Sequence, residues 1–578
     1  MFQGVKSPLP GGCDWWRLRG ILLALPVIVG FLPLAFDSVI GGEPAAPALP
    51  DFGLILTDDG GFSFTDKDPR RSEENLRAMI QSLKGTPVKT LVYEVAAGSQ
   101  VMFYPTKVGS VWGWRAVAGE KEEAWIKRMP IHRAAAANGL DAVRTAGKEA
   151  KDMGLYFMPG YRMNDGHFAK NPAENVLTGE FWMNNRERCT LGVSPIAGHD
   201  EYAALFDFSH QAVREHSLAV IREVIDRYCD IMDGIQLDFM RHPLFFPPGT
   251  AQDRAHLMTE LLTSVRAGLD DAGKREGRFL VLSVRAPATL ATCRGAGLEV
   301  ERWIADGLVN LIIPSPSITL SHDMPVDEWV TLARVRGVKI HPGILPRTQF
   351  HWPFVEAPTA ASYGIAANEN VGGPLVRGTV RNFLAMGASG FEMYNYNLPA
   401  KAEFARATLE ALADPWRGDR VYAITPSYWR EREPIFEYPR ALPAVLPEAS
   451  PVDLPIFLGE ELPKADRQKE LPVALRLGFR GLKPSKAGIV IKINDRKIYE
   501  GPVAGIATPT CGRGSQPSRL QPPVADCYLQ IPIADSGLFR MGRNKLTLIL
   551  QGPDSGHSVQ VVEAGVAVFD RTGTLGGN

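Results

Sequence analysis

Residues 233–243 read Asp-Gly-Ile-Gln-Leu-Asp-Phe-Met-Arg-His-Pro and place three chemically useful side chains close together. The alternating apolar residues predict a buried strand over 234–239, with Asp238, Arg241 and His242 at its carboxyl end. A carboxylate in that position can act as acid, base or nucleophile, and a nearby arginine keeps it ionised. We therefore take Asp238 as the candidate catalytic carboxylate, with Arg241 and His242 positioning Asp238 or a substrate. The alternative is an acid that only pairs with Arg241 to hold the loop.

Chemistry that uses two carboxylates needs a partner for Asp238, and four acids are candidates. Glu392 is the first choice because it lies on the last predicted strand beside Tyr394, where partial burial raises a carboxyl pKa. Glu94 is the second, since it lies in the apolar run 91–95, where an unpaired charge is costly. Asp58 and Asp165 lie just before glycines, so shaping a turn is their alternative role.

These residues belong to a pattern of short apolar runs that alternate with segments of helical period from residue 51 onward. Such alternation predicts parallel strands joined by helices. The clearest helix signal has Val213, Val220 and Tyr228 on one face, with Ser209 expected to cap it, and residues 253–272 repeat the pattern. Eight such units favour a (β/α)8 barrel (TIM barrel) over the alternative, an open doubly wound sheet. The predicted strands are 52–57, 90–95, 155–161, 234–239, 279–285, 308–314, 338–343 and 389–394.

In a (β/α)8 barrel the carboxyl ends of the strands meet at one face, so polar residues there are expected to form one site. A ring of acids, amides, arginines and aromatic residues suits a sugar, since rings stack on pyranoses and amides bind hydroxyls. Arg285 and His341 are expected to bind an anionic substituent such as a uronate or sulfate. The predicted substrate-binding residues are Glu94, Tyr104, Tyr161, Asn164, Asp165, Trp182, Arg241, His242, Arg285, His341 and Tyr394.

Two segments resemble the family 10-like glycosyl hydrolase group of (β/α)8-barrel proteins. They are residues 204–214, Ala-Leu-Phe-Asp-Phe-Ser-His-Gln-Ala-Val-Arg, and residues 233–243; Phe181-Trp182, 161–164 and 388–396 also match in position. The resemblance covers about residues 51–409 and implies a (β/α)8 barrel and glycoside hydrolysis, without naming a sugar. We expect a glycoside hydrolase with Asp238 and Glu392 as its catalytic pair. The alternative is a non-catalytic carbohydrate-binding protein on the same barrel.

The composition changes after Pro443, where Pro-rich sequence leads into alternating strand patterns. Residues 473–479, 489–493 and 545–550 are predicted strands, with turns at Asn494-Asp495 and at residues 542–544. We expect a barrel domain over 51–442, then a linker and a C-terminal all-β sandwich domain over 443–578. The sandwich is expected to pack on the barrel, with sugar binding as the alternative.

The N-terminal 50 residues have the layout of an export signal. Lys6, Arg17 and Arg19 precede the apolar run 21–36, and a Gly/Pro/Ala-rich stretch follows over 41–50. We expect a signal peptide, or else a retained membrane anchor, and folded domains outside the cytoplasm. A disulfide between Cys511 and Cys527 fits export, with unpaired thiols as the alternative.

The remaining composition argues against other partners. The net charge of -1 and the pI near 6.9 give no basic surface for nucleic acid. No Cys-x-x-Cys or His-x-x-x-His spacing is present, so we expect no metal site and no cofactor. A metal-dependent deacetylase has little support, because it needs a His/Asp cluster that the spacing does not reveal.

Overall fold

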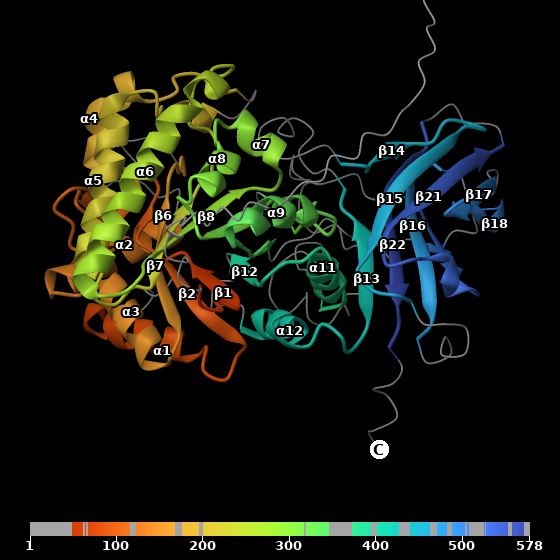
Figure 1. Cartoon of the computed structure of the whole chain (residues 1–578), viewed down its shortest axis with the longest axis horizontal. Helices are drawn as coiled ribbons and strands as arrows, with labels where there is room; N and C mark the ends of the chain where they lie inside the picture. Colours follow the sequence, from red (N-terminus) through yellow and green to blue (C-terminus); the bar gives the residue numbers. More distant parts are fainter. Residues whose placement is uncertain are drawn as a thin grey trace, which may run out of the picture. The chain divides into compact units, whose positions relative to one another are not determined.

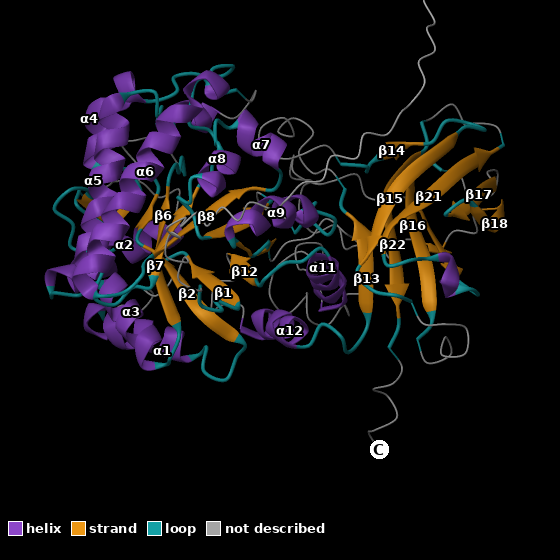
Figure 2. Ribbon diagram, in the orientation of Figure 1, coloured by secondary structure: helices purple, strands orange, loops and turns teal. Residues whose placement is uncertain are grey.

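The fold of the described residues is mixed α/β, with one parallel sheet, its helices and several antiparallel sheets (Figures 1 and 2). The computed structural model describes residues 49–61, 64, 68–115, 123–167, 176–195, 200–316, 320–345, 373–394, 402–426, 440–462, 471–482, 488–502, 506–507, 525, 527–552 and 558–570. The N-terminal segment and Cys511 lie outside these residues, so the export signal and the disulfide stay predictions. Within the described part of the chain, no helix has the length and apolar character needed to span a bilayer.

The parallel sheet has nine strands in the order β10-β9-β8-β7-β6-β2-β1-β12-β11. Each of the eight predicted runs overlaps at least one strand of this sheet, and the seventh run overlaps both β10 and β11. These two short strands lie at opposite edges of the order, and only His341 and Pro342 separate them in the chain. The bounds are β1 Leu54–Asp58, β2 Val88–Glu94, β6 Tyr156–Arg162, β7 Gly234–Asp238, β8 Val281–Pro287, β9 Leu311–Ser315, β10 Lys339–Ile340, β11 Gly343–Ile344 and β12 Phe391–Tyr394.

Helices follow the strands along the chain, as the helical spacing predicted. In α5, Val213, Val220 and Tyr228 are buried together on one face, as expected. The predicted cap is wrong: His210 is the N-cap residue, while Ser209 lies one residue earlier and donates its backbone N–H to Asp207 Oδ1. The α-helices are α1 Ser72–Gln81, α2 Glu123–Ala137, α3 Ala142–Asp152, α4 Glu180–Cys189, α5 Gln211–Tyr228, α6 Ala251–Glu276, α7 Leu290–Gly295, α8 Val300–Ala305, α9 Val326–Ala333, α11 Gly373–Ala385 and α12 Ala402–Ala413.

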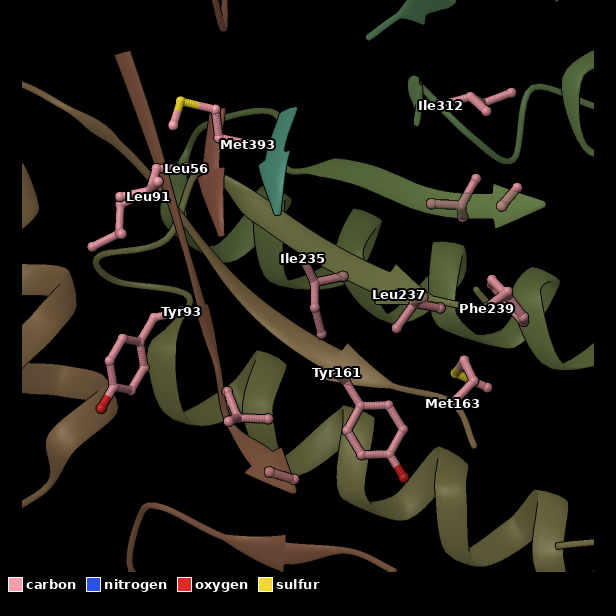
Figure 3. Close-up of a cluster of buried hydrophobic side chains, with 14 of the residues drawn as sticks. Leu56, Leu91, Tyr93, Tyr161, Met163, Ile235, Leu237, Phe239, Ile312 and Met393 are labelled. Atoms are coloured by element: carbon pink, nitrogen blue, oxygen red, sulfur yellow. The ribbon is translucent and has the colours of Figure 1, made fainter. Parts of the chain in front are cut away.

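The two faces of the parallel sheet carry different side chains, because successive residues of a strand point to opposite sides. One face packs against the helices, and Figure 3 shows part of that cluster, including Leu56, Leu91 and Leu237. The other face holds a separate small apolar core of Phe52, Ile55, Val92, Met158, Val281, Leu311 and Ile313. Two residues further along the strands, toward their carboxyl ends, this inner face becomes polar.

The C-terminal part consists of antiparallel strands around a second apolar core. One sheet has the order β13-β22-β16-β20-β19, with β14 also on β22; the other has the order β15-β21-β17-β18. The bounds are β13 Arg420–Ile424, β14 Ala444–Val445, β15 Pro451–Leu458, β16 Val473–Arg480, β17 Gly488–Ile493, β18 Arg496–Pro502, β19 Ile506–Ala507, β20 Cys527–Pro532, β21 Gly542–Gln551 and β22 Gln560–Val568. Strand β13 precedes the predicted boundary at residue 443, yet it pairs with β22.

One of the two predicted turns in this part is confirmed and the other is wrong. Asn494 and Asp495 join β17 to β18 with positive φ angles of 48° and 69°, which short polar residues tolerate best. Gly542 to Asn544 instead begin strand β21, where they pair with β15. Glycine and asparagine are common in turns, but here pairing with β15 holds these residues in an extended strand.

Candidate active site

Asp238 and Arg285 form the central ion pair at the carboxyl ends of β7 and β8. The two residues are register partners on neighbouring strands, and both side chains are fully buried. Arg285 Nη1 donates to Asp238 Oδ1 at 3.1 Å and to Oδ2 at 3.0 Å. The backbone N–H groups of Met240 and Arg241 donate to Oδ1 at 2.7 and 3.1 Å. The alternative, an ion pair with the Arg241 side chain, is therefore wrong: Arg285 is the partner of Asp238.

Glu392 lies on the other side of the same guanidinium. Its Oε2 is 3.7 Å from Arg285 Nε, and its Oε1 accepts from Thr57 Oγ1 at 2.5 Å and from Gln236 Nε2 at 3.0 Å. Burial raises the pKa of Glu392, and the charge of Arg285 partly opposes that rise. Because Asp238 and Glu392 flank one guanidinium, their carboxyl groups lie within the ~9.5 Å that separates paired carboxylates in glycoside hydrolysis.

Glu94 is the third buried acid on this face, at the carboxyl end of β2. Neither of its carboxyl oxygens has a hydrogen-bond partner in the described part of the chain. Gly160, its register partner on β6, leaves it room, since an added Cβ there would lie 3.1 Å from Glu94 Cδ. Burial raises the pKa of Glu94 well above its usual range, Arg162 lowers it, and Asp238 and Glu392 raise it further. Burial is the largest of these effects and favours the protonated form of Glu94 beside the ion pair.

Arg162, at the end of β6, is a second buried guanidinium that binds two carboxylates. It donates to Asp165 Oδ2 at 3.1 Å and also to Asp59. Sequence reasoning missed Arg162, Asp59 and Gln236 as site residues. The alternation of side chains along a strand was the available signal, because residues two positions apart point to the same face. Gln236 shares a face with Asp238 in this way, and Arg162 shares one with Gly160.

Asp165, His167 and His242 form a cluster at the ends of β6 and β7. Asp165 Oδ1 accepts from the His167 ring at Nδ1 and lies 3.6 Å from His242 Nδ1. One ligand atom from each residue lies within 4.8 Å of the others, so the expectation that no His/Asp cluster exists is wrong. The sequence spacing hid it because His242 comes from a different strand. Two guanidinium groups oppose a cation here, because Arg162 binds Asp165 and Arg241 contacts His167 Nε2.

Several predicted substrate-binding residues have structural partners instead. Tyr104 donates to Glu223 of α5 at 2.9 Å, and Trp182 donates to the Ala204 carbonyl at 2.8 Å. Tyr161 lies on the helix-facing side of β6 with Leu237 and Met163 (Figure 3), where Gln100 donates to its hydroxyl. All three rings are buried. These aromatic residues pack between the sheet and its covering segments, and they do not join the carboxylate cluster.

One further candidate, Asn164, binds backbone groups, and the two predicted anion-binding residues are buried. Asn164 donates to the carbonyls of Phe206 and Leu244, and it accepts from the Phe206 N–H. His341 lies against Gly390, before the start of β12, where burial lowers its pKa to about 3. Arg285 is fully buried against the Tyr394 ring, 3.6 Å from its centroid. An anionic substrate group does not reach His341 or Arg285 in this arrangement.

Asp58 lies apart from the cluster, as the turn alternative proposed. Its Oδ1 accepts from the Gly60 N–H at 2.8 Å. Its register partner Tyr93 belongs to the helix-facing core and donates its hydroxyl to the Gly60 carbonyl. Asp58 is thus a turn residue on the outer side of β1.

A cavity of about 500 Å³ lies away from the carboxylates, beside α2. Its one charged lining residue, Arg133, donates to the carbonyls of Gly113 and Arg115 and so has a structural role. The carboxylate cluster, and not this cavity, is the candidate active site. The cavity is lined by Pro105, Val111, Trp112, Gly113, Trp114, Arg133, Ala136 and Ala137.

No family model matches this chain, and no curated protein matches its sequence. The resemblance to the family 10-like group therefore stays a prediction. Glycosidases are among the structural neighbours. The α-L-fucosidase from Vibrio sp. strain EJY3 is 10% identical with a TM-score of 0.38, over 90% of this chain and 97% of the fucosidase.

Two other neighbours are similarly distant. A noncanonic maltogenic α-amylase from Thermotoga neapolitana is 10% identical with a TM-score of 0.33, over 86% of this chain and 98% of the amylase. A cycloisomaltooligosaccharide glucanotransferase from Paenibacillus sp. is 9% identical with a TM-score of 0.33, over 89% of this chain. This chain spans 57% of that enzyme. Likenesses of this size carry no argument about mechanism.

Proposed function

We propose that this protein is an exported glycoside hydrolase that cleaves the glycosidic bonds of an oligosaccharide or polysaccharide. The observation that carries the proposal is the placement of Asp238 and Glu392 on either side of Arg285, at the carboxyl ends of parallel strands. Paired carboxyl groups at this spacing are the usual machinery of glycoside hydrolysis. The N-terminal sequence pattern is the basis for export.

The proposed scaffold is a (β/α)8 barrel followed by a β-sandwich. The pairing of the sheet edges supports closure, because β10 pairs with β9 while β11, two residues further on, pairs with β12. The intervening residues bond to both neighbours: His341 N–H donates to Ile312 and the Pro342 carbonyl accepts from Glu392 N–H. Counted as one strand, residues 339–344 complete a ring of eight. The second apolar core between the two antiparallel sheets supports the sandwich.

In the proposed mechanism, Asp238 is the charged carboxylate that acts as nucleophile or as base toward water. Glu392 is our first choice for the general acid, because burial raises its pKa and Arg285 holds it beside Asp238. It would protonate the leaving-group oxygen as the glycosidic bond breaks. Glu94 is the alternative acid, since burial raises its pKa and its carboxyl oxygens have no hydrogen-bond partner among the described residues.

The burial of the cluster favours a second function, a carbohydrate-binding protein without catalysis. Asp238, Arg285 and Glu392 are all nearly inaccessible, with exposed fractions of 1%, 0% and 0%. A sugar must reach these groups for hydrolysis, whereas binding at the rim requires no such contact. Turnover measurements separate the two functions.

The test is a screen of the purified protein on a glycan panel with analysis of released products, followed by Asp238→Asn. We expect the variant to lose at least about 10³-fold of the turnover while still binding glycan. Asp233→Asn is the matched control, because Asp233 precedes the same strand and binds Lys151 at 2.9 Å, away from the cluster. That control should lose stability and keep kcat. Undiminished turnover in Asp238→Asn would refute the assignment.

A further inference from the structure

Arg241 is the arginine of this site that has no acidic partner among the residues that the structure describes. Arg162 binds Asp165 and Asp59, and Arg285 binds Asp238 and approaches Glu392. Across the described part of the chain, Arg241 makes no ion pair, and its buried Nε lacks a hydrogen-bond acceptor. A partly buried guanidinium in this state has unused donors and an uncompensated charge.

Hydrogen bonds hold the Arg241 backbone at Asp238 and its guanidinium at His167. The Arg241 backbone N–H donates to Asp238 Oδ1 at 3.1 Å, while the side-chain Nη2 contacts His167 Nε2. Because Asp165 accepts from His167 Nδ1, the ring proton is assigned to Nδ1 and Nε2 is left as an acceptor. A buried carboxylate thus sets the tautomer that fixes Arg241.

The neighbours of Arg241 do not neutralise it, and they open to solvent. Burial, and then the charge of Arg241, lower the pKa values of His167 and His242, so both rings are neutral. Their side chains are 27% and 11% exposed, whereas that of Arg285 is 0% exposed. Arg241 itself is partly exposed while Arg162 and Arg285 are buried, so among the three arginines it is the one at the rim.

We propose that Arg241 binds an anionic group of the glycan, a carboxylate or a sulfate. The planar fork of a guanidinium matches two oxygens of either group. The inference rests on the proposed function, because the anion is part of the sugar that reaches Asp238. It assigns anion binding to Arg241, which has donors available, in place of the buried Arg285 and His341 that the sequence suggested. A divalent cation on Asp165, His167 and His242 is the competing occupant of this region.

Sodium glucuronate, glucose 6-sulfate and glucose are the probes, titrated by calorimetry at equal ionic strength into the full-length protein. We expect one of the two anions to bind at least about tenfold more tightly than glucose, and the better one identifies the group. In Arg241→Gln, the affinity for the better anion should fall to the affinity for glucose. Arg241→Lys should keep part of the preference, since it keeps the charge and loses the fork. Arg302→Gln, at an exposed arginine of α8, should change nothing.

Three results would overturn the inference. They are equal affinity for glucose and both anions, an unchanged preference in folded Arg241→Gln, or a stoichiometric divalent metal that is lost on His167→Ala. Thermal unfolding of the two Arg241 variants shows that they are folded. Asp238→Asn separates this inference from the proposed function, because it should abolish hydrolysis and leave the anion preference intact. Anion preference without any hydrolysis in the wild type would refute the function alone, and hydrolysis without anion preference would refute the inference alone.

Discussion

Arg285 donates from one nitrogen, Nη1, to both carboxylate oxygens of Asp238, at 3.1 and 3.0 Å. Its Nη2 donates to Ser315 Oγ at 2.9 Å, and its Nε lies 3.7 Å from Glu392. A single guanidinium therefore sets the positions of two acids from β7 and β12. We regard Arg285 as a positioning residue, since it is fully buried and its guanidinium contacts both acids.

Arg285→Lys tests this role, because lysine keeps the charge and cannot bridge the two acids. We expect kcat to fall about 10²-fold and the free energy of unfolding to fall by about 3 kcal/mol, as for a broken buried ion pair. Arg266→Lys is the matched control, since Arg266 is a buried arginine that binds Asp270 on the helix side. It should lose stability without losing kcat. Normal kcat in Arg285→Lys would show that Arg285 does not position the catalytic acids.

Glu392→Gln and Glu94→Gln identify the proton donor. The variant that lacks the general acid should lose about 10²- to 10⁴-fold on glycosides with poor leaving groups. It should keep its activity on aryl glycosides whose leaving group needs no proton. We expect this pattern for Glu392→Gln in a comparison of kcat values on the two substrate types. The same pattern in Glu94→Gln, with ordinary losses in Glu392→Gln, would assign the role to Glu94.

Asp58→Asn should stabilise the protein in a pH-dependent way. Burial raises the pKa of Asp58 to about 7, whereas that of an unfolded aspartate is about 3.9. Between these values the folded state keeps a proton that the unfolded state loses, so wild-type stability falls as pH rises toward 7. Asp58→Asn keeps the oxygen that accepts from Gly60. Relative to this variant, the free energy of unfolding of the wild type should fall by ~4 kcal/mol above pH ~7.

Urea unfolding of wild type and Asp58→Asn at pH values from about 4 to 8 measures this difference. A difference in unfolding free energy that does not change with pH would show that Asp58 is ionised in the folded protein. Activity should be unchanged in the variant, because Asp58 lies on the outer side of β1.

Tyr104→Phe should affect stability and leave glycan binding unchanged. The variant removes the hydrogen bond to Glu223, which also accepts from Thr106 Oγ1 and the Lys107 N–H. We expect the free energy of unfolding to fall by about 1–3 kcal/mol. Denaturant unfolding and glycan titration measure the two quantities. Weaker glycan binding with unchanged stability would show that Tyr104 contacts the substrate.

Local pattern predicted the strands well, because strand formation leaves a two-residue period in the chain. All eight predicted runs overlap strands of the parallel sheet, and the same period places Gln236 and Asp238 on one face. Residue type alone did not predict the roles of the aromatic residues. Tyr104 and Trp182 suit a sugar as well as they suit a core, and their actual partners come from segments distant in sequence.

The sequence by itself determined which residues form strands, that Asp238 ends the fourth of them, and that acids gather at the ends of the others. Only the tertiary structure decided which charges pair. Asp238 and Arg241 are three residues apart in the chain, but Arg285, 47 residues away, is the partner that Asp238 meets across neighbouring strands. The same neighbourhood brings His242 to Asp165 and leaves Arg241 without an acid. Ion pairing depends on the distance between charges in space. The order of strands in the sheet sets that distance, and separation along the sequence does not.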